Sequence, residues 1–381
     1  MTPDILMSDQ GGRKHAAVSN ATEAKRDAAQ RRWRVAILGA TGAVGQRLVQ
    51  LLQDHPWFEL AALAASERSA GKLYAEAARW YLEGGMPASA AALTVRPCEP
   101  DLPVDLALSG LDAAVAGEIE HRLAAAGIPV ISNARNHRME PDVPLLVPEV
   151  NADHARVIEV QRRHRGWKGG FIATNPNCST VGLVMALRPL QASFGIRRVA
   201  VTTFQAISGA GYPGVASLDI LGNVIPFIPM EEEKMESETG KILGQLGPQG
   251  FAPAPFTVSA QCHRVAVEDG HLLAVSAELE GGPSPDAVRA ALRSFRSPID
   301  GLGLPSLPHP TIVVRDEPDR PQPRLDRMEG RGMTLSVGRV RRCPILGIKF
   351  NALVHNTIRG AAGAAILNAE LLVAQGYVQP R

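Results

Sequence analysis

Cys178 occupies a position typical of a reactive cysteine. It lies in the stretch TNPNCSTVGLVMALRPL, which starts at Thr174, directly after Asn-Pro-Asn and directly before an apolar run. This pattern predicts a loop leading into a helix at Cys178, and the dipole and unpaired N–H groups of a helix N-terminus favour a thiolate. A structural thiol would be expected inside the apolar run. These features make Cys178 a candidate nucleophile.

His271 is the best candidate for an acid or base beside this thiol. It follows the Asp-Gly turn in CHRVAVEDGH (262–271), and Arg264 lies near the predicted start of the preceding strand. If the turn folds back, Arg264 and His271 face one cleft. A thiol and an imidazole together can carry out covalent acyl chemistry. The spacing alone leaves open the alternative that His271 is a surface residue of a loop. No set of histidines has metal-ligand spacing, so no metal is predicted.

A glycine-rich loop between a strand and a helix predicts a dinucleotide site. GATGAVG supplies Gly39, Gly42 and Gly45, after an apolar strand at 35–38 and before a helix at about 43–53. In such a loop the first glycine turns the chain, the second admits a pyrophosphate, and the third lets helix and strand pack closely. The helix N-terminus then attracts the phosphates. The alternative is a glycine-rich turn without a ligand.

The residues after the second predicted strand indicate which nicotinamide cofactor is bound. NAD sites usually place an acidic residue there for the ribose hydroxyls. The stretch ASERSAGK (65–72) contains Glu67, but also Ser66, Arg68 and Ser69. Hydroxyl groups and a guanidinium suit a 2′-phosphate, so we predict NADP. The alternative is that Arg68 is a solvated loop charge.

The elements around these motifs predict an α/β protein with two domains. Apolar segments alternate with helix-like segments up to about residue 180, which is typical of a parallel sheet covered on both faces; the strands are expected at 35–38, 58–66, 104–110 and 128–133. Later strand-like stretches predict an α+β domain with a large, mostly antiparallel sheet. The segment at 301–324 is rich in Pro and Gly and is expected to be a loop.

These patterns also predict the domain limits. We expect a Rossmann-like NADP-binding domain at 33–180, completed by a C-terminal helix within 356–377 that packs back against it. A catalytic and dimerisation domain is expected at 181–355. Residues 1–32 carry few large apolar side chains and are predicted to be a disordered tail.

Composition excludes several other classes of protein. The 40 Lys and Arg nearly balance the 38 Asp and Glu, unlike in a nucleic-acid binder. No apolar run approaches the length of a transmembrane helix. The four cysteines lie far apart without a CxxC pair, which argues against zinc and a disulfide framework and fits a reducing cytoplasm. We therefore predict a cytoplasmic protein with neither nucleic-acid nor membrane partners.

Taken together, the motifs resemble those of the archaeal and fungal branch of the aspartate-semialdehyde dehydrogenases. The matching stretches are GATGAVGQRLVQLL, ASERSAGK, NHRMEPDVPLLVPEVN, TNPNCSTVGLV, QAISGAGYPGV, EEEKMESETGKILG, RVAVEDGH, and RPQPRLDR followed by HNTIRGAAGAAILNAELL. They occur in this order from about residue 33 to 377, which is nearly the whole chain outside the predicted tail. Their order is far more specific than the glycine loop alone.

The resemblance implies roles for individual residues. Cys178 is implied as the nucleophile, His271 as the acid/base, and Gln205 as a group that orients the reacting centre. The residues implied to bind substrate are Arg264 for the carboxylate, Glu231 for the amine, and Arg138 and Lys234 for the phosphate, with Asn177 close by. The residues implied to bind the cofactor are Gly39, Thr41, Gly42, Ala43, Val44, Gly45, Ser66, Arg68, Ser69, Ser109, Ser208, Gly209 and Asn356, the last three at its nicotinamide end.

The reaction implied by the resemblance is the reversible NADPH-dependent reductive dephosphorylation of 4-phospho-L-aspartate to L-aspartate 4-semialdehyde. It would proceed through a thioester on Cys178 and serve lysine, threonine and methionine biosynthesis. The backbone N–H groups after Cys178 are expected to form the oxyanion site. Alternatives are a reductase of malonyl- or succinyl-coenzyme A or of N-acetyl-glutamyl phosphate, and a non-catalytic NADP-binding dimer. A homodimer or homotetramer is expected, with the large sheet as its contact surface.

Two residues depart from the family pattern. Ala266 stands where proline is usual, and Ser237 where an aromatic residue is usual. Ser237 is expected to loosen the packing under the substrate loop.

Overall fold

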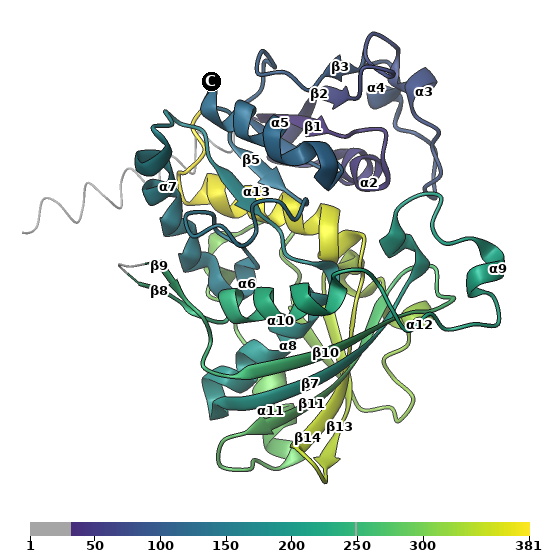
Figure 1. Ribbon diagram of the computed structural model, residues 1–381, viewed down its shortest axis with the longest axis vertical. Coiled ribbons are helices and arrows are strands. Elements are labelled where there is room, and N and C mark those ends of the chain that lie inside the picture. The colour runs from purple at the N-terminus through teal and green to yellow at the C-terminus, as the bar shows by residue number, and fades with distance from the viewer. Residues whose placement is uncertain (1–31, 248–249) are drawn as a thin grey trace, which may run out of the picture.

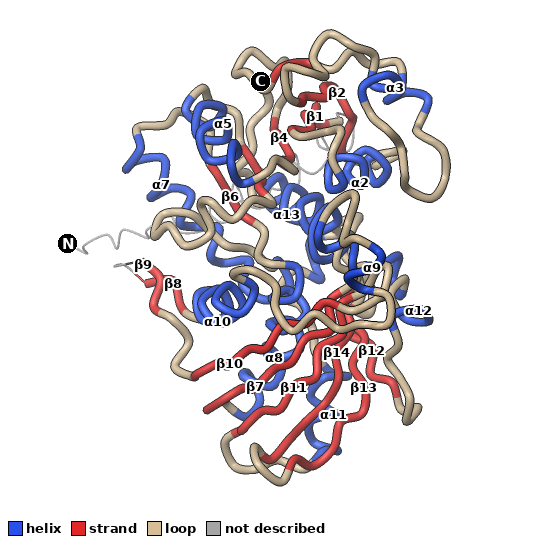
Figure 2. Tube along the Cα trace, turned by 45° about the vertical axis from the view of Figure 1, so that its right-hand side comes forward, coloured by secondary structure: helices blue, strands red, loops and turns tan. Residues whose placement is uncertain are grey.

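Two domains, each built on a six-stranded sheet, make up the computed structural model, which describes residues 32–247 and 250–381 (Figures 1 and 2). Apart from Arg32, the predicted tail at 1–32 lies outside the described residues. The α/β class and the division into a dinucleotide-type domain and a second domain with a large sheet are confirmed. Among the described residues, no helix is both long enough and apolar enough to cross a membrane.

The first sheet has the strand order β3-β2-β1-β4-β5-β6, and each strand is parallel to its neighbour. The strands are β1 (Trp33–Leu38), β2 (Phe58–Ala65), β3 (Arg96–Pro97), β4 (Leu106–Ser109), β5 (Val130–Ser132) and β6 (Ile172–Thr174). This is the order of a doubly wound dinucleotide-binding sheet, which binds its ligand beyond the carboxyl ends of the strands. The four predicted strands of this domain are confirmed.

Helices on both faces bury this sheet. They are α2 (Ala43–Leu52), α3 (Tyr74–Ala77), α4 (Ala88–Ala91), α5 (Ala113–Ala125), α6 (Pro148–Asn151), the 3₁₀ turn η1 (Ala152–Arg156) and α7 (Val157–Arg165). The C-terminal helix α13 (Gly363–Ala374) returns to the same domain (Figure 1). Its Ala365 and Ala369 belong to the hydrophobic cluster that holds Val35 and Ile37 of β1. Small side chains allow this close approach, as the sequence predicts.

The second sheet has the order β10-β7-β11-β14-β13-β12. Its strands are β7 (Ile196–Gln205), β10 (Thr257–Arg264), β11 (His271–Leu279), β12 (Ile312–Arg315), β13 (Leu335–Cys343) and β14 (Gly347–Val354). The three central pairs are antiparallel, and the pair at each edge is parallel. The prediction that 301–324 is a loop is wrong at β12. Its β-branched residues form an edge strand, which needs a partner on one side only.

One face of this sheet is covered by helices. They are α8 (Cys178–Phe194), α10 (Glu231–Ile242) and α11 (Pro285–Ser294), and all three share its core. On the opposite face, outward side chains of β7 such as Ala200 and Phe204 stay exposed. The remaining short elements lie in the connections: η2 (Ile207–Ala210), α9 (Ser217–Ile220), β8 (Gln245–Gly247), β9 (Gly250–Ala252), η3 (Asp300–Leu302), α12 (Pro323–Asp326) and η4 (Glu329–Gly332).

A buried ion pair lies where the C-terminal segment meets the first domain. Arg359 belongs to the π-helical turn η5 (Ile358–Ala362), and its Nη2 lies 2.5 Å from Oε2 of Glu149 on α6. Neither side chain is exposed to solvent. Among the described residues, Arg359 Nε and Nη1 and Glu149 Oε1 have no hydrogen-bond partner. The Arg359 guanidinium and the Glu149 carboxylate therefore each stabilise the other's buried charge.

We expect Arg359→Met alone to lower the free energy of unfolding by about 3–5 kcal/mol, because it leaves the Glu149 carboxylate buried and unpaired. The double variant Glu149→Leu/Arg359→Met should recover most of this loss, because it removes both charges. Denaturant unfolding of the two variants measures the difference. A double variant as unstable as the single one would show that the pair is not the source of the effect.

Candidate active site

The nucleophile predicted from the sequence stands at the first residue of α8. Asn177 caps this helix, and its Oδ1 accepts hydrogen bonds from the N–H groups of Ser179 at 2.9 Å and Thr180 at 3.2 Å. The predicted loop and helix are therefore confirmed. His271 Nε2 lies 3.2 Å from Cys178 Sγ, so the structure brings the predicted thiol and imidazole together.

The predicted oxyanion site needs a correction. The N–H groups of Ser179 and Thr180 already donate to the cap, so they cannot also bind an oxyanion. The N–H of Cys178 itself has no acceptor within the described part of the chain, which makes it the candidate donor. The sequence contains the capping asparagine but not the direction in which its side chain turns.

Arg264 and His271 reach the same cleft by a route that differs from the prediction. Arg264 is the last residue of β10 rather than near the start of a strand, and His271 is the first residue of β11. These strands do not pair with each other, because β7 lies between them. The connection therefore passes over the carboxyl end of β7. It places Arg264 and His271 at the same end of the sheet, on either side of β7. A Cβ atom on Gly209 would lie 2.8 Å from Arg264 Nη1 and 3.1 Å from His271 Cε1, so a larger residue there would displace the Arg264 side chain.

The backbone determines the tautomer of His271. The N–H of Ala206 donates to Nδ1 at 3.0 Å, so a neutral imidazole carries its hydrogen on Nε2 and points it at Cys178 Sγ. Burial lowers the pKa of His271 well below its usual value, and the charge of Arg264 acts in the same direction. The imidazolium would also lose the Ala206 bond, since it has no free lone pair. His271 is thus a neutral hydrogen-bond donor to sulfur near pH 7.

The surroundings of Cys178 favour the thiol before substrate binds. The side chain is partly exposed, yet burial raises its pKa to about 12, with the Glu231 carboxylate as a second cause. The charges of Lys234, Arg264 and Arg138 oppose this rise. Burial and the Glu231 carboxylate therefore act against the thiolate that the helix N-terminus favours.

Helix α10 presents a charged face to the cleft. Glu231, Lys234, Glu238 and Lys241 follow one another at intervals of three or four residues, which places them on one side of a helix. Glu231 accepts hydrogen bonds from Asn177 Nδ2 at 2.7 Å and from Gln205 Nε2 at 3.1 Å, and it pairs with Lys234. The predicted substrate residues on α10 therefore contact each other directly.

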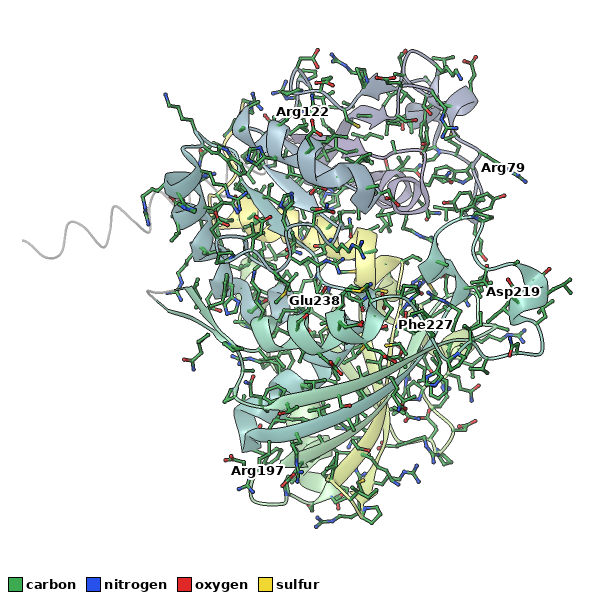
Figure 3. The ribbon with its side chains drawn as sticks, in the orientation of Figure 1. Arg79, Arg122, Arg197, Asp219, Phe227 and Glu238 are labelled. Carbon is green, nitrogen blue, oxygen red and sulfur yellow. The ribbon has the colours of Figure 1, made fainter. Side chains whose placement is uncertain are left out.

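Glu238 is a residue that the sequence prediction missed. Its carboxylate accepts hydrogen bonds from Arg138 Nη1 at 2.8 Å and from the backbone N–H of Asn177 at 2.6 Å. Glu238 is labelled on α10, above the large sheet, in Figure 3. It therefore ties the predicted phosphate-binding arginine to the cap of the nucleophile helix. The signal was present in the sequence, because Glu238 continues the spacing that begins at Glu231.

Lys241, also missed, fixes the loop that carries Arg138. Its Nζ donates to the carbonyl oxygens of Arg138, Glu140 and Val143, each at 2.8 Å. Burial lowers the pKa of Lys241 to about 8, while nearby carboxylates, first among them Glu140, oppose this effect. A lysine bound to three carbonyl groups and buried in this way holds the backbone and is not free for substrate.

The predicted cofactor residues fit a dinucleotide. Gly39 has a φ of +72°, and a Cβ on Gly45 would lie 2.2 Å from the oxygen of Gly39. Gly42 caps α2 without a side-chain hydrogen bond, which leaves N–H groups free for phosphate. The other predicted positions follow the carboxyl edge of the sheet: Thr41, Ala43 and Val44 at the start of α2, Ser66, Arg68 and Ser69 in the loop after β2, and Ser109 at the end of β4.

The predicted nicotinamide end adjoins a cavity of about 640 Å³ between the domains. Ala43 and Ser208 contribute to its lining, together with His355. Asn356 holds the neighbouring loops together, because its Nδ2 donates to Ser208 Oγ at 2.8 Å and its Oδ1 accepts from the N–H of Gly270 at 2.8 Å. Among the described residues, no three His, Cys, Asp or Glu side chains gather as metal ligands would.

The departures from the family pattern lie away from this cleft. Ser237 is exposed on the outer side of α10, and its Oγ donates to the carbonyl oxygen of Glu233 at 2.7 Å. The expectation that Ser237 loosens the packing under the substrate loop is therefore wrong. Ala266 is exposed in the connection between β10 and β11.

Two matches to family models cover most of the chain, and both agree with this geometry. The contact of Cys178 with His271 and the order of the first sheet fit the class of nicotinamide-dependent dehydrogenases that use thiol chemistry. Residues 34–158 match the semialdehyde dehydrogenase NAD binding domain, and residues 187–359 match the semialdehyde dehydrogenase dimerisation domain.

The most similar proteins include relatives from archaea and fungi. The chain is 50% identical to aspartate-semialdehyde dehydrogenase of Archaeoglobus fulgidus over 348 residues, which is 91% of this chain and 100% of that protein. It is 51% identical to the Schizosaccharomyces pombe enzyme over 353 residues, covering 91% and 99% of the two chains. The chain belongs to the aspartate-semialdehyde dehydrogenase family.

Solved structures show the same likeness. The Candida albicans aspartate semialdehyde dehydrogenase with NADP superposes with a TM-score of 0.85 at 46% identity, over 91% of this chain and all of that one. The Vibrio cholerae aspartate semialdehyde dehydrogenase II complexed with ASA gives a TM-score of 0.71 at 30% identity, over 90% and 98% of the two chains.

Gly360 in the π-helical turn sets the position of the thiol, and the sequence analysis assigned it no role although it lies in the motif HNTIRG. A Cβ atom there would lie 2.7 Å from Cys178 Cβ and 3.1 Å from its Cα. The turn is held by the N–H of Gly360 donating to the carbonyl of His355 at 2.9 Å. Single π-helical turns are frequent at functional sites. Here the turn lets the backbone pack directly against the nucleophile.

We expect Gly360→Ala to slow alkylation of Cys178 about tenfold or more, because the displaced sulfur loses the hydrogen bond from His271 that favours its anion. Peptide mass spectrometry after iodoacetamide treatment measures the rate. Gly301→Ala is the matched control, since a Cβ at Gly301 meets nothing within 4 Å. Equal alkylation rates in the two variants would contradict a positioning role for Gly360.

Proposed function

We propose that this protein catalyses the NADPH-dependent reductive dephosphorylation of 4-phospho-L-aspartate to L-aspartate 4-semialdehyde, a step of aspartate-family amino-acid biosynthesis. The observation that carries the proposal is the contact of Cys178 Sγ with His271 Nε2 at 3.2 Å, beside a cleft with both acidic and basic side chains. The archaeal and fungal relatives with this name span almost the whole chain. The relatives solved with NADP and with ASA support the same ligands here.

The charges around the thiol suit each end of this substrate. Arg264 binds the carboxylate through its guanidinium, which is buried and anchored by one hydrogen bond from Nη1 to the carbonyl of Ala206 at 2.7 Å. Glu231 binds the amine, and Lys234, now paired with Glu231, turns to the phosphate. Arg138 supports the phosphate from the other side, with Glu238 holding its guanidinium. Asn177 and Gln205 keep the Glu231 carboxylate in place.

The cofactor is held along the edge of the first sheet. The N-terminus of α2 binds the pyrophosphate, and Ser66, Arg68 and Ser69 bind the 2′-phosphate. Ser208, Gly209 and Asn356 face the nicotinamide. When bound, NADPH supplies a hydride to the thioester carbon.

The reaction divides into two steps at Cys178. Sulfur attacks the acyl carbon, a C–S bond forms, the C–O bond to phosphate breaks, and the thiol proton leaves with the phosphate. The N–H of Cys178 and the Nε2–H of His271 donate to the charges that develop on oxygen and sulfur. After reduction of the thioester, the negative charge on oxygen is stabilised by the N–H of Cys178. This charge re-forms the carbonyl as the C–S bond breaks, and the aldehyde is released. Sulfur leaves as a thiolate, held by the hydrogen bond from His271 Nε2–H, and takes one proton from solvent to return to the thiol.

The same proposal includes the organisation of the chain. Residues 33–180 with the C-terminal helix bind NADP, and residues 181–355 carry out catalysis and pair two subunits. The exposed face of the second sheet is the contact surface of a homodimer or of the dimers within a homotetramer. A cytoplasmic location is supported by the four cysteines, Cys98, Cys178, Cys262 and Cys343, which are all free.

The test is phosphate-dependent reduction of NADP by L-aspartate 4-semialdehyde, followed at the nicotinamide absorbance. We expect Cys178→Ala to lose about 10³-fold or more of this activity while still binding NADP, because it removes the covalent route. Cys262→Ala is the matched control, since its thiol is buried against Met235 and plays no part in the proposed steps. Turnover in Cys178→Ala, or turnover that needs no phosphate, would contradict the proposal.

A further inference from the structure

The cavity between the two domains extends beyond the residues predicted to bind the cofactor. Its volume is about 640 Å³. One wall is the outer side of α2, with Arg47 and Leu51, and another comes from the second domain. Of the predicted cofactor residues that the structure describes, only Ala43 and Ser208 line it, and Cys178 does not. Most of this space therefore lies outside both the proposed cofactor site and the catalytic cleft.

Two stacked tyrosines join the domains at this cavity. Tyr81 comes from the first domain and Tyr212 from the second, and both contribute to the lining. Their ring centres lie 4.6 Å apart, with 15° between the ring planes. Arg79, labelled on the right of Figure 3, lies over the Tyr212 ring at 5.8 Å from its centre. The two walls are therefore held by a direct contact, which fixes the width of the cavity at this point.

The wall formed by α2 carries a partly buried guanidinium. Arg47 Nη1 donates to Gln50 Oε1 at 2.8 Å, and its Nε is buried without a hydrogen-bond partner among the described residues. Burial lowers the pKa of Arg47, and the carboxylate of Asp269 is the first charge that opposes this effect. The two groups thus influence each other, yet no salt bridge joins them in the described part of the chain. Both line the cavity, so a ligand inside it can reach both charges.

The wall from the second domain carries an unpaired carboxylate. Asp269 Oδ1 is buried, and it accepts no hydrogen bond from any residue that the structure describes. The neighbouring Glu268 differs, because it is exposed and its carboxylate pairs with Arg327 at 3.4 Å. Burying a carboxylate oxygen without a partner is costly, so Asp269 points to a positively charged partner inside the cavity.

Three more polar groups at this cavity lack a partner within the described ranges. His355 is 2% exposed and its Nδ1 is unbonded, and burial lowers its pKa to about 4, so the imidazole is neutral near pH 7. Thr357 Oγ1 and the Tyr81 hydroxyl are buried and unbonded as well. Buried polar groups in folded proteins are nearly always hydrogen-bonded. These groups, with Arg47 and Asp269, indicate a ligand that offers hydrogen bonds and both signs of charge.

We propose that this cavity binds a free α-amino acid with an uncharged, apolar side chain, at a site separate from the catalytic cleft. The Arg47 guanidinium binds its carboxylate, and the Asp269 carboxylate binds its ammonium group. Leu51 and Ile358 offer an apolar surface to its side chain. An ion of a single charge would leave either Arg47 or Asp269 without a partner, whereas a zwitterion satisfies both.

The first test is isothermal titration calorimetry of the NADP-saturated wild type with L-methionine, whose flexible side chain adapts to irregular apolar surfaces. One molecule should bind per chain, with a Kd of about 1 mM or tighter. The absence of saturable binding would overturn the proposal. Binding that NADP abolishes would also overturn it, because the amino acid would then occupy the cofactor site. The measurement requires no catalysis, so its result stands even if the proposed reaction is wrong.

The second test removes the two charges one at a time. Arg47→Gln and Asp269→Asn should each weaken binding of L-methionine about tenfold or more, because each removes a hydrogen bond between charged groups. Glu268→Gln is the matched control, since it lies in the same turn but is exposed and paired with Arg327. An equal loss in the control would show a general charge effect and overturn the proposal. So would an equal loss in Arg264→Gln, which would place the amino acid in the catalytic cleft.

Ligand analogues keep the proposal testable if a variant does not fold. On the wild type, L-methioninamide lacks the carboxylate and N-acetyl-L-methionine lacks the ammonium group, and each should bind about tenfold more weakly or worse than L-methionine. In Arg47→Gln the amide and L-methionine should bind alike, because the partner of the carboxylate is gone. Analogues that bind the wild type as tightly as L-methionine would overturn the proposal.

Discussion

The cap that Asn177 places on α8 is the contact on which the rest of the site depends. Its Oδ1 holds the first turn of the helix, its Nδ2 holds Glu231, and its backbone N–H is held by Glu238. One residue therefore relates the nucleophile to the charged face of α10. Because both helices pack on the large sheet, the sheet sets the distance between Cys178 and the charges proposed to bind substrate.

This arrangement limits the free-energy cost of burying many charged side chains in one cleft. An unpaired buried charge is expensive, and every ionised group here has a partner of opposite charge or a backbone dipole. Arg138 pairs with Glu238, Glu231 with Lys234, and Lys241 with three carbonyl groups. In the proposed reaction, the carboxylate, amine and phosphate of the substrate would replace some of these partners. The cleft is thus organised for charges before the charges of the substrate arrive.

The protonation states of the Cys178 thiol and the His271 imidazole depend on burial and on one backbone hydrogen bond. Burial favours the neutral forms of both Cys178 and His271, and the Ala206 N–H fixes which nitrogen faces the sulfur. The neutral imidazole stabilises negative charge by donating a hydrogen bond. An imidazolium would require the Ala206 bond to open. Proton transfer is thereby tied to the arrival of a substrate whose leaving group is itself a base.

Much of this was predictable from the sequence, because local patterns carry it. The glycine loop, the strand alternation and the start of a helix at Cys178 are short-range features, and each was confirmed. The route from Arg264 to His271 was not predictable, because a crossing over β7 and a hairpin turn look alike in the residues between them. Gly360 and the Glu149–Arg359 pair were missed because their partners lie more than 100 residues away in the chain. Glu238 was missed although its helical spacing from Glu231 could have indicated it.

The most direct test of the central claim is to trap the acyl group on the enzyme. Protein is mixed with L-aspartate 4-semialdehyde and NADP in the absence of phosphate, quenched in acid, and mapped by peptide mass spectrometry. The account predicts an aspartyl thioester on Cys178 that disappears when phosphate is added before the quench. No adduct, or an adduct on another residue that phosphate does not remove, would contradict it.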